Sequence, residues 1–127
     1  MRDIKFRGKI KNPKVNKWVY GYLVDECHIN EKNQLGYTLI RKETIGQYTG
    51  LKDKNGKEIY EGDIVKFKDR ITNEEDIFTI KYCEERASFV LSNKSYNEMT
   101  INVKDRILLV EVIGNIYDNK NLLEEGE

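Results

Sequence analysis

The sequence predicts a mainly β protein: one small barrel-type domain over residues 1–127, with extra strands and hairpins and a short C-terminal helix. Three observations support this prediction. The stretch from Ile45 to Phe67 holds four of the nine glycines and is typical of a series of turns. Several segments alternate apolar and polar residues, as half-buried strands do. A helix-start signal near the C-terminus, at Asn119, accounts for the helix.

Length and composition limit the function classes. A chain of 127 residues with 39% hydrophobic residues can bury one modest core. The 22 basic and 22 acidic side chains cancel, so the net charge does not indicate a strongly basic nucleic-acid binder. No apolar run approaches the ~20 residues of a membrane span, and no signal-peptide core follows Met1. We therefore expect a cytoplasmic protein with no membrane partner.

The N-terminal part predicts two strands. Ile4 and Phe6 share one face of the first strand, which we expect to lie on the core. The stretch 18–24 is apolar on both faces, which is typical of a central strand. Its aromatic residues alternate on one side, and such a row can stack bases or pack in a core. We favour core packing for this row, which consists of Trp18, Tyr20 and Tyr22.

The segment from Asp25 to Gly36 has the composition of an exposed loop. It contains Cys27 and His28, the only histidine of the chain. With the distant Cys83, these residues do not form a recognisable zinc spacing, so we predict no metal site and a surface role for His28. The two cysteines are expected to be free thiols, and residues 37–42 predict a further strand.

The central stretch predicts tight turns. Asn55-Gly56 favours a two-residue type I′ hairpin turn, and Asp53 is placed to accept backbone N–H groups as an Asx turn. Gly62 is the expected positive-φ residue of a second reversal. Asp63–Lys68 then alternates as a half-buried strand. This succession of turn, short arm, glycine corner and strand is a common way to begin or close a small barrel.

The stretch Tyr48–Val65 closely resembles the signature of the YopX family of phage and prophage proteins of low-GC Gram-positive bacteria. Met1–Lys9 looks like the start of that family and Glu111–Tyr117 like its closing strand. Lys120 is a departure, because relatives often place a proline there. The signature residues, which we interpret as structural, are Tyr48, Thr49, Gly50, Asp53, Asn55, Gly56, Tyr60, Glu61, Gly62 and Asp63.

The resemblance implies a β-rich fold with a small SH3-like barrel and a tendency to form homo-oligomers. It implies no established activity, no catalytic residues and no cofactor. The cytoplasm of an infected or lysogenic bacterial host is the expected location. From residue type alone, Glu58, Glu61 and Asp63 are candidates for acid–base chemistry, but their spacing is not diagnostic of a hydrolase.

The C-terminal part predicts a hairpin between residues 77–82 and 87–91, because both segments alternate. Residues 106–113 are apolar on both faces and predict a central strand. Asn119 is the expected N-cap of the terminal helix, which carries Leu122 and Leu123.

Three function classes follow. The first is a non-enzymatic phage accessory protein that self-associates and binds a phage or host protein. The second is a nucleic-acid-binding barrel. It is suggested by the basic N-terminal arm, which is residues 1–17, by the aromatic row and by the lysines beside the Asn-Gly turn. Its candidate contact residues are Arg7, Lys9, Trp18, Tyr20, Lys52 and Lys54. The third is the carboxylate-based hydrolase.

Overall fold

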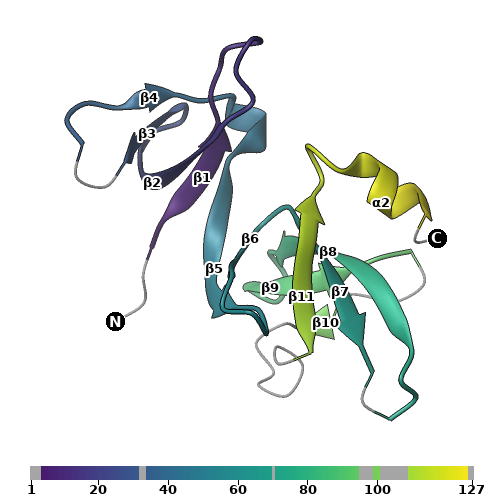
Figure 1. Ribbon diagram of the computed structural model, residues 1–127. Helices are drawn as coiled ribbons and strands as arrows, with labels where there is room; N and C mark the ends of the chain where they lie inside the picture. Colours follow the sequence, from purple (N-terminus) through teal and green to yellow (C-terminus); the bar gives the residue numbers. More distant parts are fainter. Residues whose placement is uncertain (1–3, 32–33, 70, 95–98, 101–108, 126–127) are drawn as a thin grey trace. The chain divides into compact units, whose positions relative to one another are not determined.

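The computed structural model of the chain describes residues 4–31, 34–69, 71–94, 99–100 and 109–125. These residues belong to two compact units, Met1–Gly50 and Leu51–Glu127, which are described separately below. Both are built from antiparallel strands (Figure 1). The prediction of a mainly β protein is therefore confirmed. None of the described helices is long and apolar enough to cross a membrane.

The first unit contains β1 (Phe6–Lys9), β2 (Trp18–Asp25), β3 (His28–Glu31), β4 (Thr38–Leu39), the 3₁₀ turn η1 (Lys42–Thr44) and the start of β5 (Gly46–Lys52). These strands belong to a sheet with the order β4-β3-β2-β1-β5-β6. β2 lies between β1 and β3, so the prediction of a central strand is confirmed. The core of this unit is formed by Val19, Ile29 and Ile40, and Phe6, Ile10 and Ile45 pack against them.

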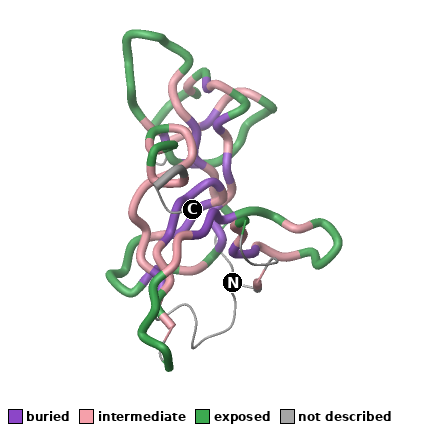
Figure 2. The backbone as a smooth tube through the Cα atoms, turned by 90° about the vertical axis from the view of Figure 1, so that its right-hand side faces the viewer, coloured by how far each residue is buried: buried purple, intermediate pink, exposed green. Residues whose placement is uncertain are grey.

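The second unit contains β6 (Glu58–Tyr60), β7 (Asp63–Lys68), β8 (Glu75–Cys83), β9 (Ser88–Ser92), β10 (Met99–Thr100), β11 (Val110–Asn115) and α2 (Lys120–Glu125). The second sheet has the order β10-β9-β8-β7-β11. Its core is formed by Ile59, Val65, Phe78, Ile80, Leu91 and Val110. The buried residues concentrate in the strands, and the exposed residues concentrate in the turns and loops (Figure 2).

The barrel was not predicted correctly, since each sheet ends in two different strands among the described residues and neither sheet closes on itself. The reason lies at the Glu61-Gly62 reversal. Gly62 has a φ of 92°, as predicted, but β6 before it belongs to one sheet and β7 after it belongs to the other. The glycine corner thus moves the chain between sheets.

The turn between β5 and β6 differs from the predicted two-residue type I′ turn. β5 ends at Lys52 and β6 begins at Glu58. Gly56 has a φ of 83° and donates its N–H to the carbonyl oxygen of Asp53 at 3.0 Å, and Asn55 is not among the positive-φ residues of the described chain. This is the pattern of a three-residue hairpin loop, in which a turn is followed by one left-handed glycine. One left-handed residue is enough there, so Asn55 avoids that conformation.

Three other segments differ from the sequence prediction. The expected loop after Asp25 contains β3, because Ile29 is fully buried and joins the core. The strand expected over residues 37–42 is reduced to the two residues of β4, followed by η1. β7 is not half-buried at its start, since Ile64 and Val65 are both 0% exposed on opposite faces. Lying between β8 and β11 gives β7 this burial.

The C-terminal part agrees in outline. β8 and β9 form the predicted hairpin, in which Ile80 pairs with Leu91. Residues 101–108, including part of the predicted strand 106–113, lie outside the described residues. α2 confirms the terminal helix and begins at Lys120 without the proline of relatives. Asn119 precedes the helix, but its side-chain oxygen accepts the N–H of Asn115 at 3.1 Å.

Candidate functional site

The aromatic row of β2 lies on the exposed face of the strand. Tyr20 is 46% exposed and Tyr22 is 59% exposed, whereas Val19 on the opposite face is 1% exposed. The core-packing interpretation is therefore wrong for these two tyrosines. The reason is that the core of this unit is filled by aliphatic side chains, and Gly21 beside Val19 brings β3 close on the core side.

Two predicted cationic residues lie on the same face as the aromatic row. Arg7 of β1 is paired with Tyr20, and Lys9 is paired with Trp18, and such cross-strand partners share one face of a sheet. The Arg7 guanidinium lies 4.6 Å from the centre of the Trp18 ring, and the Lys9 ammonium lies 5.8 Å from it. These are cation–π distances. Arg7 itself is only 5% exposed, so its charge is placed under the surface.

The other two candidate nucleic-acid contacts lie in or beside the start of the second unit. Lys52 ends β5, and Lys54 follows in the turn; both are exposed. The Lys54 ammonium lies 3.9 Å from a carboxylate oxygen of Glu111 on β11, and the Asn55 amide donates to the same carboxylate at 3.3 Å. The structure therefore groups Arg7, Lys9, Trp18 and Tyr20 on one face and places the two lysines at a separate turn.

The signature aspartates hold the backbone. Oδ1 of Asp53 accepts the N–H groups of Asn55 at 2.8 Å and Lys57 at 2.9 Å, which confirms the predicted Asx turn. Its Oδ2 accepts the N–H of Val112 on β11 at 2.9 Å. Oδ2 of Asp63, which is 2% exposed, accepts the N–H of Tyr60 at 2.7 Å across the Gly62 corner. Both aspartates thus accept backbone N–H groups, in hydrogen bonds that are partly buried at Asp53 and buried at Asp63.

The remaining carboxylates proposed for hydrolase chemistry flank the same corner. Oε1 of Glu58 accepts the Tyr60 hydroxyl at 3.1 Å, and Glu61 is half-buried. At this corner, Asp63 accepts a backbone N–H and Glu58 accepts a phenol hydroxyl.

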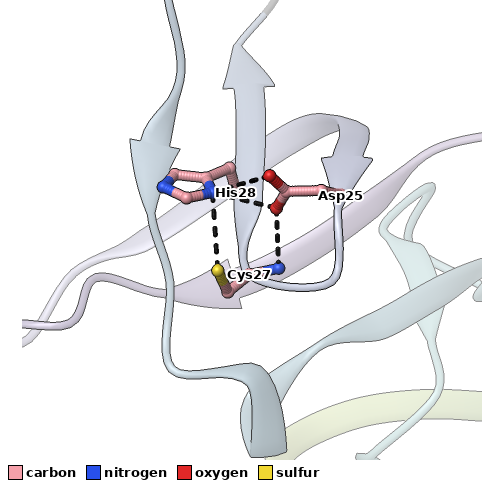
Figure 3. Close-up of side chains that lie close together, drawn as sticks. All are labelled: Asp25, Cys27 and His28. Carbon is pink, nitrogen blue, oxygen red and sulfur yellow. Dashed lines mark hydrogen bonds and ion pairs between the residues drawn. The ribbon is translucent and has the colours of Figure 1, made fainter.

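The structure also assembles a cluster that the sequence analysis did not find. Asp25, Cys27 and His28 lie at the turn between β2 and β3 (Figure 3). Nδ1 of His28 lies 2.9 Å from Oδ1 of Asp25 and 3.4 Å from Sγ of Cys27. Oδ1 of Asp25 also accepts the Cys27 backbone N–H at 2.9 Å. A thiol, an imidazole and a carboxylate therefore meet at one point.

A β-bulge produces this cluster. The pairing of β2 with β3 shifts between Leu23 and Asp25, so Val24 has no partner and Asp25 lies opposite His28. Bulges re-aim side chains in this way. The signal missed in the sequence was Ile29: an apolar residue directly after His28 indicates a strand, and a strand there requires a tight turn at Asp25–Cys27.

The local environment changes two pKa values in this cluster. The hydrogen bond from the Cys27 backbone N–H, followed by the hydrogen bond to His28, lowers the pKa of Asp25. Partial burial, followed by the nearby charge of Asp25, raises the pKa of the Cys27 thiol. The His28 ring also packs edge-on against Tyr37, with ring centres 5.4 Å apart.

Comparisons with known proteins agree with the signature described above. The family model for the YopX protein matches residues 5–124, which span both units. In structure the chain is similar to protein EF1440 from Enterococcus faecalis, whose crystal structure gives a TM-score of 0.52 at 24% identity. That match covers 97% of this chain and 99% of the other, and at this identity it shows likeness of fold alone. No curated protein matches this chain in sequence.

Proposed function

Because the chain belongs to the YopX family, whose model spans residues 5–124, we propose that it is a non-enzymatic phage or prophage accessory protein that self-associates through its first unit. The homo-oligomer then presents its remaining surface to a phage or host protein. One observation supports this proposal, namely the uneven distribution of exposed apolar side chains between the described parts of the two units.

Among the residues that the structure describes, most of the exposed large apolar side chains lie in the first unit. In the second unit, the described residues of this kind are Ile71 and Tyr82. Tyr20 and Tyr22 are neighbours on one face of β2, and adjoining exposed apolar side chains are typical of an interaction site. In the first unit they are Ile4, Val15, Tyr20, Tyr22, Leu23, Val24, Leu35, Tyr37 and Leu39.

A second copy of the chain is the occupant that we infer for this surface. The 22 basic and 22 acidic side chains cancel, so two copies carry no net charge that would repel them. A symmetric contact also buries the same tyrosines from both copies, which doubles the apolar area removed from water by one patch. Tyrosine is one of the side chains enriched at the energetic centres of such contacts.

Measuring the particle mass in solution against protein concentration tests the proposal. Wild type is expected to form a discrete oligomer, and Tyr22→Ser is expected to weaken its association at least about tenfold, the size of effect typical of truncating a central interface tyrosine. Tyr82→Ser is the matched control, because Tyr82 is 46% exposed in the other unit. A wild-type chain that stays monomeric at every concentration contradicts the proposal.

A second candidate function is binding of single-stranded nucleic acid, favoured by the cation–aromatic face of Arg7, Lys9, Trp18 and Tyr20. An exposed aromatic ring such as that of Tyr20 can stack a base, and a nearby ammonium group such as that of the half-buried Lys9 can neutralise a phosphate. On this alternative a labelled oligonucleotide binds with an affinity that falls steeply with salt, and Lys9→Gln reduces the salt slope whereas Lys14→Gln in the neighbouring exposed loop does not. A complex insensitive to both salt and Lys9→Gln argues against this function.

A further inference from the structure

We propose that Asp25, Cys27 and His28 form a binding site for Zn²⁺, with one coordination position left for water or another ligand. The three side chains provide a carboxylate oxygen, a thiol sulfur and an imidazole nitrogen, all within 4.8 Å of one another. These are the three kinds of protein ligand that zinc takes. The inference does not depend on the proposed self-association.

The arrangement of the contacts favours a metal site over a catalytic triad. In a triad, the nucleophile and the carboxylate bind different nitrogens of the histidine ring. Here Sγ of Cys27 and Oδ1 of Asp25 both approach Nδ1 of His28, at 3.4 Å and 2.9 Å, and the other ring nitrogen points away from them (Figure 3). Three donor atoms that converge on one point suit a shared cation.

The distances fit the size of the ion. Tetrahedral zinc with bonds of about 2.0–2.3 Å separates its nitrogen and sulfur ligands by roughly 3.6 Å, and its nitrogen and oxygen ligands by roughly 3.4 Å. The sulfur–nitrogen distance of 3.4 Å is already close to this value. The oxygen–nitrogen distance of 2.9 Å has to widen slightly when a metal replaces the hydrogen bond. Asp25 can move for this purpose, because its side chain is 52% exposed.

The ligand set also selects the metal. A thiolate and an imidazole favour zinc and chemically similar transition metals over Mg²⁺ and Ca²⁺, which bind oxygen ligands. The turn between β2 and β3 supplies all three ligands, so the ion needs no rearrangement of the sheet. With three protein ligands, a tetrahedral ion retains one position that the protein does not fill.

Titration of the untagged, reduced full-length chain with Co²⁺ and then Zn²⁺ tests the site. An untagged chain is needed because His28 is the only histidine, and a histidine tag would add competing ligands. We expect one ion per chain, a cobalt spectrum with a thiolate charge-transfer band, and loss of that spectrum when zinc displaces cobalt. Absence of saturable binding of either ion overturns the proposal.

Three variants assign the ligands. Cys27→Ser and Asp25→Asn are each expected to weaken zinc binding by at least about 10–100-fold, the loss seen even when a residue supporting a ligand is removed. Cys83→Ser is the matched control, because Cys83 is the other free and partly buried cysteine. Its zinc affinity is expected to equal that of wild type. Full binding by Cys27→Ser, or loss of binding in Cys83→Ser, overturns the assignment.

Two measurements on the wild-type chain test the site even if the variants fail to fold. Zinc is expected to slow alkylation of Cys27 and to leave the alkylation rate of Cys83 unchanged, since a metal-bound thiolate is not free to react. Zinc should also shift the ring signals of His28, which are unambiguous because the chain has one histidine. Equal alkylation rates of Cys27 with and without zinc overturn the proposal.

Discussion

Two turns, one in each unit, contain an aspartate that accepts a backbone N–H, but the two aspartates differ in their exposure and in their other partners. Asp25 is the last residue of β2 and Asp53 directly follows β5, and each accepts at Oδ1 the N–H of the residue two positions later, at 2.9 Å and 2.8 Å. Asp53 is 7% exposed and also accepts the N–H of Val112 from β11. Asp25 is exposed, and its other partner is the side chain of His28.

The difference between the turns shows what burial does to a carboxylate. The Asp53 carboxylate accepts three backbone N–H groups in partly buried hydrogen bonds, whereas the N–H···O bond to Asp25 is exposed, so water replaces the acceptor less easily at Asp53. The Asp25 carboxylate faces a thiol and an imidazole beside solvent, so these groups can exchange a hydrogen bond for a metal ion. We therefore expect the Asp53 turn to stabilise the fold, and the Asp25 turn is the one that we propose to bind zinc.

The largest expected effect is that of Asp53→Ala. It removes the acceptor for the N–H groups of Asn55, Lys57 and Val112, and charged hydrogen bonds of this kind predict a loss of about 4 kcal/mol in the free energy of unfolding. Urea unfolding followed by far-UV circular dichroism measures this loss.

Asp69→Ala is the control for that variant in the same unit. Oδ1 of Asp69 also accepts two local N–H groups, from Ile71 at 2.8 Å and Thr72 at 3.2 Å, but in an exposed loop. We expect a loss of about 1 kcal/mol or less, because water can replace the acceptor. Equal losses in both aspartate variants would show that burial does not distinguish the turns.

The second-largest loss of stability is expected for Gly21→Ala, which tests whether close contact between β2 and β3 keeps the Asp25 turn in place. A Cβ atom at Gly21 would lie 2.0 Å from the backbone oxygen of Asn30 on β3. The strands must move apart, and we expect a loss of roughly 3 kcal/mol from such overpacking. Trp18 is the only tryptophan and lies in β2, so its fluorescence reports unfolding of this unit.

Gly36→Ala is the matched control in the first unit. Gly36 has a φ of 80°, and an added Cβ atom would have no neighbour within 4 Å. Only the backbone conformation opposes the substitution, at about 1–2 kcal/mol. A Gly21→Ala variant as stable as Gly36→Ala would mean that close contact between β2 and β3 is not what holds the turn.

The smallest expected effect is that of Asp25→Asn in the absence of metal. The side chain is exposed and its partners are solvated, so the urea midpoint at neutral pH should equal that of wild type within error. Because the pKa of Asp25 is lowered in the folded chain, any stabilisation by its charge is present near neutral pH and is lost as the pH falls through that pKa. A large destabilisation at neutral pH would make this turn structural, like that of Asp53.

Much of the local structure could be predicted from residue type. The Asx role of Asp53 and the positive φ of Gly62 follow from what an aspartate and a glycine do at a turn, and both are confirmed. The hairpin of β8 and β9 follows from alternation, and the terminal helix begins directly after Asn119 as predicted, although the Asn119 side chain bonds Asn115. These features depend on residues that are adjacent in the chain, so the sequence alone is enough to predict them.

The two open sheets among the described residues, in place of a barrel, and the exposure of Tyr20 and Tyr22 could not be predicted in the same way. Alternation shows that three aromatic residues share a face, but not whether that face meets the core. That outcome depends on which side chains from other strands fill the unit, here Ile29 and Ile40. The Asp25–His28 pairing likewise depends on a bulge that shifts the strand register by one residue.

The sequence by itself therefore determined the class of the fold, the roles of Asp53 and Gly62 in their turns, and the family signature, because these depend on backbone preferences and on the order of residues along the chain. The tertiary structure alone decided which face of β2 is exposed, which sheet each strand joins, and that Asp25, Cys27 and His28 meet. The physical reason is that burial and strand register are set by contacts between segments that are distant in the sequence. The residues of one segment do not specify which other segment it pairs with or packs against.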